Sequence, residues 1–103
     1  MFFGPSTDLT PAAFQAKLQS EGGVVIDCRT SAETAEGMWP GAKQLDWMSG
    51  EFQQRVSELD PQQNCYLYCR SGARSGAAAS FLRSKGFAHV FNLGGYGSIA
   101  RLQ

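Results

Sequence analysis

The sequence predicts a small α/β domain built on a parallel sheet with helices on both faces. Short β-branched or aromatic runs alternate along the chain with segments of helical composition, which is the order expected of a parallel sheet. Two of these runs are apolar throughout, as in strands buried on both sides. A chain of 103 residues that is 43% hydrophobic suits one core, so residues 1–103 are expected to form a single domain.

The first helix and the first strand are predicted from their end signals. Thr10 is able to cap free backbone N–H groups and Pro11 is tolerated in a first turn, so a helix is expected to begin there. Two consecutive glycines then stop the helix, and the β-branched run at residues 24–26 predicts a buried strand. The residues expected at the carboxyl end of this strand are Asp27, Cys28 and Arg29.

The middle of the chain is expected to form short elements joined by loops. Residues 31–36 have the composition of a helical turn, which Gly37 closes. Residues 38–41 must be a loop because they contain adjacent Pro and Gly, and a short strand is expected to start near Ala42. Apolar residues recur at helical spacing between positions 48 and 59, which predicts a second helix that ends at an Asp-Pro pair.

The last part of the chain repeats the alternation of strand and helix. Residues 65–68 are aromatic or apolar and run into a polar, glycine-containing loop, so they predict a central strand. The alanine-rich segment 75–85 predicts a helix that packs closely on the sheet and ends at Gly86. Residues 90–93 predict a last strand, and residues 96–103 a helical tail.

Composition excludes several classes of partner. Nine Lys and Arg residues balance nine Asp and Glu residues, so no overall field attracts nucleic acid or an acidic membrane. No apolar run approaches the roughly 20 residues that span a bilayer, and the first residues lack the features of a secretion signal. We therefore expect a cytoplasmic protein with no nucleic-acid or membrane partner. Three widely spaced cysteines and one histidine argue against structural zinc and against a disulfide framework.

The loop after the predicted central strand has the features of an anion site. Cys69 lies between the carboxyl end of a strand and the start of a helix, where sites gather in parallel sheets. Gly72 permits a turn that directs backbone N–H groups inward, and the helix adds its positive end. Arg70 and Arg74 add two positive charges. These features favour the thiolate, so we expect Cys69 to be a nucleophile of lowered pKa rather than an inert core cysteine.

The remaining cysteines and the histidine are assigned structural roles. Cys28 and Cys65 lack such surroundings in sequence and are expected in the core. Cys28 is expected at a neighbouring strand end, so a disulfide with Cys69 is an alternative state under oxidation. His89 lies at the start of a strand, away from the loop, so a Cys-His mechanism of the thiol protease kind is disfavoured.

Four separated stretches resemble the rhodanese domain, and the resemblance covers nearly the full length of the chain. They are Val-Ile-Asp-Cys-Arg at residues 25–29, the Glu-to-Gly-to-Pro-Gly-Ala segment at 33–42, the Cys-x-x-Gly-x-Arg-Ser loop with its strand at 68–75, and the closing segment at 86–95. The chain departs from the family pattern at Met38 and Trp39, where His-Ile is usual. The resemblance implies an about five-stranded, mainly parallel sheet and sulfurtransferase activity.

The resemblance also implies a mechanism and a set of site residues. Cys69 would take the outer sulfur of thiosulfate or a related anionic donor as a persulfide and pass it to cyanide, a thiol or a protein acceptor, without metal or cofactor. Arg74 has an alternative role as a brace of the loop. The expected substrate-binding residues are Arg70, Ser71, Gly72, Ala73 and Arg74, and the expected loop-bracing residues are Asp27, Arg29 and Ser75, the last as a helix cap.

Two rival functions remain open at this point. Cysteine-dependent phosphatases and arsenate reductases place one more residue between Cys and Arg than the four that separate Cys69 from Arg74, and no acid for the leaving group is identifiable. A sulfur-relay or binding module would use the same loop without turning over thiosulfate.

Overall fold

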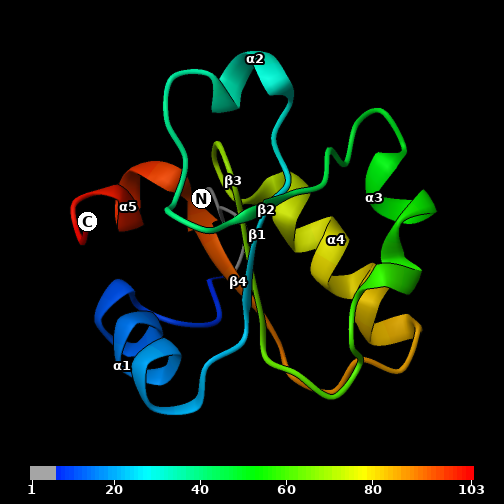
Figure 1. Cartoon of the computed structure of the whole chain (residues 1–103), viewed down its shortest axis with the longest axis horizontal. Helices are drawn as coiled ribbons and strands as arrows, with labels where there is room; N and C mark the ends of the chain where they lie inside the picture. Colours follow the sequence, from blue (N-terminus) through cyan, green and yellow to red (C-terminus); the bar gives the residue numbers. More distant parts are fainter. Residues whose placement is uncertain (1–6) are drawn as a thin grey trace, which may run out of the picture.

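A computed structural model of the chain describes residues 7–103 and shows one parallel sheet between two layers of helices (Figure 1). Hydrogen-bonded neighbours follow the order β2-β1-β3-β4, and every pair is parallel. The prediction of an α/β fold with a parallel sheet is thereby confirmed. The strands are β1 (Val24–Asp27), β2 (Lys43–Gln44), β3 (Cys65–Cys69) and β4 (Val90–Gly95).

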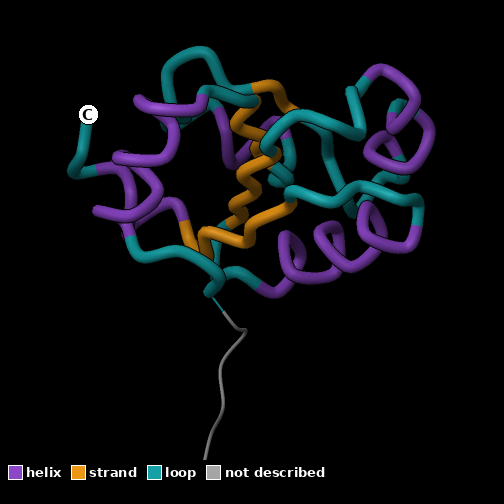
Figure 2. Tube along the Cα trace, turned by 90° about the horizontal axis from the view of Figure 1, so that it is seen from below, coloured by secondary structure: helices purple, strands orange, loops and turns teal. Residues whose placement is uncertain are grey.

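Helices cover both faces of the sheet, as expected. In Figure 2 the strands run through the middle of the molecule with helical segments on either side. No helix within residues 7–103 is long and apolar enough to cross a membrane. The helices are α1 (Pro11–Glu21), α2 (Ser31–Thr34), α3 (Glu51–Gln54), the 3-10 helix η1 (Val56–Glu58), α4 (Ala73–Ser84) and α5 (Tyr96–Ala100).

The core is divided by the sheet into two clusters. All five residues of β3 are buried, and alternate side chains enter opposite clusters because successive strand residues face opposite ways. Cys69 and Leu67 pack with the α3 and α4 side, whereas Tyr66 and Tyr68 pack with the α1 and α5 side. The central strand therefore ends with its last cysteine beneath helix α4.

The first helix begins and ends where the sequence predicts. The Thr10 side chain accepts a hydrogen bond from the backbone N–H of Ala13, with Pro11 in the first turn. Gly22 closes the helix at a positive φ of 71°, in the left-handed region that glycine tolerates. Both end signals act as local chemistry predicts.

Residues 7–103 contain four strands rather than the expected five or so. The backbone N–H of Asp8 donates to the carbonyl oxygen of Asn92 at 2.8 Å, so the chain lies against the edge of β4 there. Thr10 then turns it into α1, which prevents further pairing. Within residues 7–103, the segment against this edge is too short to form a ladder, so the described part of the chain has one strand fewer than expected.

The prediction of one helix between positions 48 and 59 is also wrong, because two short helices, α3 and η1, occupy this segment. Asp46 Oδ1 accepts from the N–H of Met48 at 2.9 Å, which makes a turn where the helix was expected to begin. Gly50, at φ 88°, precedes α3. Arg55, at φ −106° and ψ 10°, separates α3 from η1. Local polar bonds therefore outweigh the helical spacing of the apolar residues.

Candidate active site

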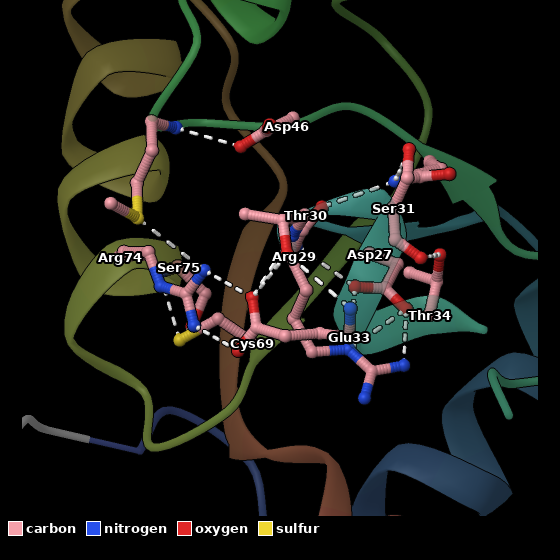
Figure 3. Close-up of polar contacts among 12 residues, drawn as sticks. Asp27, Arg29, Thr30, Ser31, Glu33, Thr34, Asp46, Cys69, Arg74 and Ser75 are labelled. Carbon is pink, nitrogen blue, oxygen red and sulfur yellow. Dashed lines mark hydrogen bonds and ion pairs between the residues drawn. The ribbon is translucent and has the colours of Figure 1, made fainter. Parts of the chain in front are cut away.

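The carboxyl ends of the two central strands place the candidate residues together. Strands β1 and β3 pair in parallel through Asp27 and Tyr68, and the N–H of Cys28 donates to the Tyr68 carbonyl oxygen at 2.9 Å. Strand β3 ends at Cys69, and α4 begins at Ala73. The Cys69 thiol thus lies where β3 ends and the loop leading to α4 begins (Figure 3).

Hydrogen bonds converge on the Cys69 sulfur. Sγ accepts from the backbone N–H of Gly72 at 3.0 Å, from the backbone N–H of Ser75 at 3.5 Å and from the Ser75 hydroxyl at 3.4 Å. Gly72 has a φ of 103°, a conformation that L side chains rarely adopt, and it is the N-cap of α4. The glycine is therefore required for the turn that directs N–H groups at the sulfur.

These hydrogen bonds favour the charged form of the cysteine. Burial of Cys69 raises its pKa, but the bonds from the Ser75 hydroxyl and from the backbone N–H groups of Ser75, Gly72 and Ser71 outweigh burial. The net result is a pKa below the ordinary value for cysteine. The site is therefore suited to hold a thiolate.

Arg74 is engaged with a carboxylate rather than free in the loop. Its two terminal nitrogens donate to the two carboxylate oxygens of Glu33, each at 2.8 Å (Figure 3). The N–H of Thr30 also donates to Glu33, in a capping box at the start of α2. The Arg74 bonds, followed by that of Thr30, lower the pKa of Glu33 to about 2. This geometry matches the bracing alternative for Arg74.

The rest of the predicted loop differs in exposure. Arg70, Ser71 and Ala73 are exposed, and Gly72 is buried. Among residues 7–103, no carboxylate forms an ion pair with Arg70. Arg70 is therefore the loop cation that is available to an incoming anion.

Asp27 and Arg29 form a buried pair behind the site. The Arg29 guanidinium donates to both carboxylate oxygens of Asp27, at 2.9 and 2.7 Å, and also to the Gly37 carbonyl oxygen at 2.7 Å. The Tyr68 hydroxyl donates to the same carboxylate at 2.7 Å. The guanidinium carbon lies 4.5 Å from the centre of the Tyr96 ring. The pair thus links β1 to β3, to the loop after α2 and to α5.

Ser75 does not cap a helix, contrary to the prediction. Helix α4 begins earlier, at Ala73, with Gly72 as N-cap, so Ser75 lies inside its first turn and is fully buried. Its hydroxyl lies 2.7 Å from Asn92 Oδ1 as well as 3.4 Å from the Cys69 sulfur. The prediction fails because the left-handed Gly72, rather than a serine, sets the start of the helix.

Asn92 is the residue at the site that sequence reasoning missed. It lies in the middle of β4 and its side chain is buried against Ser75 and Gly72. One signal was present, because a polar amide in a strand expected to be buried requires a hydrogen-bonding partner.

The other cysteines and the histidine lie at different positions along the sheet relative to Cys69. Cys28 shares the core cluster of Cys69, and burial, followed by the Cys69 charge, holds its pKa well above the ordinary value. Burial raises the pKa of Cys65 to about 11. The N–H of Cys65 donates to the carbonyl oxygen of the exposed His89 at the opposite end of the sheet from Cys69. Residues 7–103 hold no cluster of metal-ligating side chains.

The fold and the site define a class of protein, an α/β domain in which one cysteine sulfur accepts hydrogen bonds from the loop and helix that follow a central parallel strand. A sequence profile of the rhodanese-like domain matches residues 10–101. The chain belongs to the rhodanese-like domain family, as its motifs led us to expect.

Similar proteins are known from bacteria. A protein of Allochromatium vinosum named sulfurtransferase is 40% identical over 81 residues, covering 79% of this chain and 74% of that protein. The Bacillus subtilis protein YrkF, named as a candidate sulfur carrier, is 30% identical over 87 residues, covering 84% of this chain but 46% of that protein. The crystal structure of a rhodanese-like domain protein from Staphylococcus aureus has a TM-score of 0.78 and 25% identity, covering 91% of both chains.

Proposed function

We propose that this sulfurtransferase-family domain moves a sulfane sulfur from thiosulfate, or a related anionic donor, to cyanide or a thiol through a persulfide on Cys69. The observation that carries the proposal is the convergence of three hydrogen bonds on the Cys69 sulfur from Gly72 and Ser75. A buried thiolate needs such donors, and the same N–H cradle serves the charge of a persulfide.

The proposed cycle has two displacements. The Cys69 thiolate attacks the outer sulfur of the donor, a new S–S bond forms, and the donor's own bond to that sulfur breaks, with sulfite leaving on its electron pair when thiosulfate is used. The acceptor then attacks the outer persulfide sulfur, and Cys69 departs as a thiolate. Cyanide as acceptor would be released as thiocyanate, and a thiolate as acceptor would be released as a new persulfide. Because Cys69 starts and ends as a thiolate, the cycle needs no general base.

The loop residues have separate tasks in this proposal. The backbone N–H groups from Arg70 to Arg74 stabilise the terminal sulfur of the persulfide, as an oxyanion hole stabilises oxygen. The exposed Arg70 side chain attracts the anionic donor. Arg74 is held by Glu33 and braces the loop, so it is a weaker candidate for a direct ligand.

A sulfur carrier fed by a protein is the second candidate. Two observations favour it. Arg74 is paired with Glu33, so one loop cation is left for a small anion. The chain is also similar to YrkF, which is named as a candidate sulfur carrier. In a carrier, a donor protein would supply the persulfide sulfur and thiosulfate would load Cys69 poorly. A phosphatase is disfavoured because the Arg that would bind phosphate is already paired.

The proposal is tested by following sulfur on the protein itself. Purified, reduced protein is incubated with thiosulfate and its intact mass is measured, with Cys69→Ala as the test variant and Cys65→Ala, at the far end of the same strand, as the matched control. We expect one added sulfur in the wild type and in Cys65→Ala, none in Cys69→Ala, and thiocyanate after cyanide is added.

Other outcomes separate the candidates. Loading by a polysulfide or a protein persulfide, without loading by thiosulfate, would replace the thiosulfate proposal with the carrier. No sulfur on Cys69 from any of these donors would contradict both functions.

A further inference from the structure

The Ser75 hydroxyl faces two acceptors but has one hydrogen to donate. Its oxygen lies 2.7 Å from Asn92 Oδ1 and 3.4 Å from the Cys69 sulfur. A serine hydroxyl carries a single hydrogen, so it donates to one of these acceptors at a time. Ser75 is fully buried and Asn92 is 2% exposed, so water does not readily replace either partner. The two acceptors therefore compete for the same proton.

The orientation of the Asn92 amide is determined by its neighbours. Its Oδ1 accepts from the backbone N–H of Gly94 at 3.0 Å, and its Nδ2 donates to the Gly72 carbonyl oxygen at 3.2 Å. A flipped amide would place two donors against each other at Gly94 and two acceptors at Gly72. The oxygen is thus directed at Ser75, and the nitrogen supports the glycine whose own N–H reaches the Cys69 sulfur.

We propose that Asn92 is a positioning residue for sulfur transfer, which holds the Ser75 hydroxyl beside the Cys69 sulfur and accepts its hydrogen whenever that sulfur carries no charge. This inference rests on the proposed function, because it assigns each state of the hydroxyl to a step of the persulfide cycle.

The charge on the cysteine sulfur selects the acceptor. A thiolate is a charged acceptor and draws the hydroxyl hydrogen more strongly than a neutral amide oxygen. When Cys69 becomes a persulfide, the negative charge moves to the outer sulfur, and Ser75 turns back to Asn92. When the outer sulfur leaves, charge returns to Sγ and the hydroxyl stabilises the departing thiolate. The proton stays on Ser75 throughout, and no buried hydroxyl is left unsatisfied.

The charged and titratable groups around Cys69 do not replace this contact. Arg74 on α4 is paired with Glu33 of α2, and Arg70 is exposed. On the far side of Asn92, its backbone N–H donates to Asp8, which is paired with Arg83. Other titratable groups at this end of the sheet are the Cys28 thiol after β1, on which the Cys69 charge acts, and the Asp27 and Asp46 carboxylates, which act on Cys28.

The decisive test is the pH dependence of alkylation at Cys69, which needs no sulfur donor. Reduced protein is treated with iodoacetamide over a range of pH, and the modified peptide is identified by mass. Asn92→Asp places a charged acceptor beside Ser75, so the hydroxyl donates to the sulfur less often and we expect the pKa of Cys69 to rise. At pH values below that pKa, alkylation of Cys69 should be about tenfold slower than in the wild type. Asn64→Asp, in the loop before β3 at the opposite end of the sheet, is the matched control and is expected to match the wild type.

A double-mutant cycle shows whether Asn92 acts through Ser75. Ser75→Ala is expected to slow alkylation by about tenfold as well, because the sulfur loses a hydrogen bond to its charged form. In that background Asn92→Asp should have a clearly smaller effect, since only its through-space charge remains. An equal effect with and without Ser75 would overturn the proposal.

Ser75 variants keep the test decisive if Asn92→Asp does not fold. Ser75→Ala retains the Asn92 bonds to Gly72 and Gly94, and Ser75→Thr restores a hydroxyl. Wild-type alkylation in Ser75→Ala would overturn the proposal, because Asn92 cannot act through a hydroxyl that has no effect. If alkylation responds as expected while thiosulfate and other donors fail to load Cys69, the coupling of Asn92 to Cys69 through Ser75 stands, but the proposed function and the assignment of this coupling to sulfur transfer both fail.

Discussion

Arg74 at the start of α4 and Glu33 in α2 form a two-bonded ion pair, with both N–O distances at 2.8 Å. Each side chain is 20% exposed, so the pair is largely shielded from water. It links the helix that follows the cysteine loop to the turn that follows Asp27 and Arg29. The shape of the loop thus depends on a contact between segments far apart in sequence.

Replacing Glu33 with Gln is expected to destabilise the protein by about 1 kcal/mol at neutral pH, because Arg74 loses a charged, two-bonded partner. The pKa of Glu33 is lowered from 4.5 to about 2 in the folded protein, so its stabilising effect is present above pH 4.5 and is lost as the pH falls towards 2. Urea unfolding at pH 7 and pH 3 measures both effects.

The difference between wild type and Glu33→Gln should therefore shrink at the lower pH. Glu36→Gln, on an exposed neighbouring residue, is the matched control and should unfold like the wild type at both pH values. A constant difference between Glu33→Gln and wild type at both values would contradict the role assigned to the ion pair.

Asp27→Asn is expected to be the more damaging substitution, at about 3 kcal/mol, because it leaves the Arg29 guanidinium buried without a charged partner. Asp27 is fully buried and accepts from both Arg29 and Tyr68. Unfolding in guanidinium chloride, with Asp60→Asn at an exposed position as the control, measures the loss of stability in Asp27→Asn. Equal stability of the two variants would show that the buried pair does not brace the fold.

Much of the fold and part of the site follow from local sequence chemistry. Thr10 and Gly22 bound the first helix, and the β-branched run at 24–26 forms a buried strand, because capping and burial act within a few residues. The position of Cys69 before Gly72 predicted the thiolate cradle for the same reason. These features depend on neighbours in the chain.

Asn92 and the partner of Arg74 could not be predicted, because both depend on contacts between separate elements. Asn92 meets Ser75 because it pairs with Leu67 of β3, whose side chain faces the α4 side of the sheet. A single sequence gives neither this pairing nor the register shift that follows it between Leu67 and Tyr68. The sequence allows two roles for Arg74 for a related reason, since its partner Glu33 lies on another element.

An oxidised form with a Cys28–Cys69 disulfide is a prediction that follows from the strand register. Asp27 pairs with Tyr68, so the next residues, Cys28 and Cys69, are neighbours, and both face the same core cluster. Parallel strands lie about 4.8 Å apart, within the Cα separation that a disulfide spans. The oxidant in the test is diamide, which takes up the hydrogens that the two thiols lose when the disulfide forms.

The expected product has lost two hydrogens by intact mass and no longer alkylates at Cys69. Cys65→Ser should behave like the wild type and Cys28→Ser should resist the change. Because burial raises the pKa of Cys28, the reaction should be slow at neutral pH and faster at alkaline pH. Oxidation without a Cys28–Cys69 peptide pair would contradict this prediction.

Gly95 tests how closely the cysteine loop is held against the last strand. A Cβ at Gly95 would collide with the carbonyl oxygen of Arg70, whereas a Cβ at Gly97 would meet nothing within 4 Å. Gly95→Ala must therefore displace the loop backbone, at a cost of about 2 kcal/mol, and should slow alkylation of Cys69 because the N–H cradle moves.

The matched substitution Gly97→Ala lies two residues further on, inside α5, where alanine is favoured over glycine by up to about 1 kcal/mol. It should leave alkylation unchanged and slightly raise the melting temperature. Thermal unfolding and alkylation of both variants provide the measurement. If Gly95→Ala alkylates as fast as Gly97→Ala, the contact between Gly95 and Arg70 does not shape the cradle, and the backbone donors at Gly72 and Ser75 hold the sulfur without support from β4.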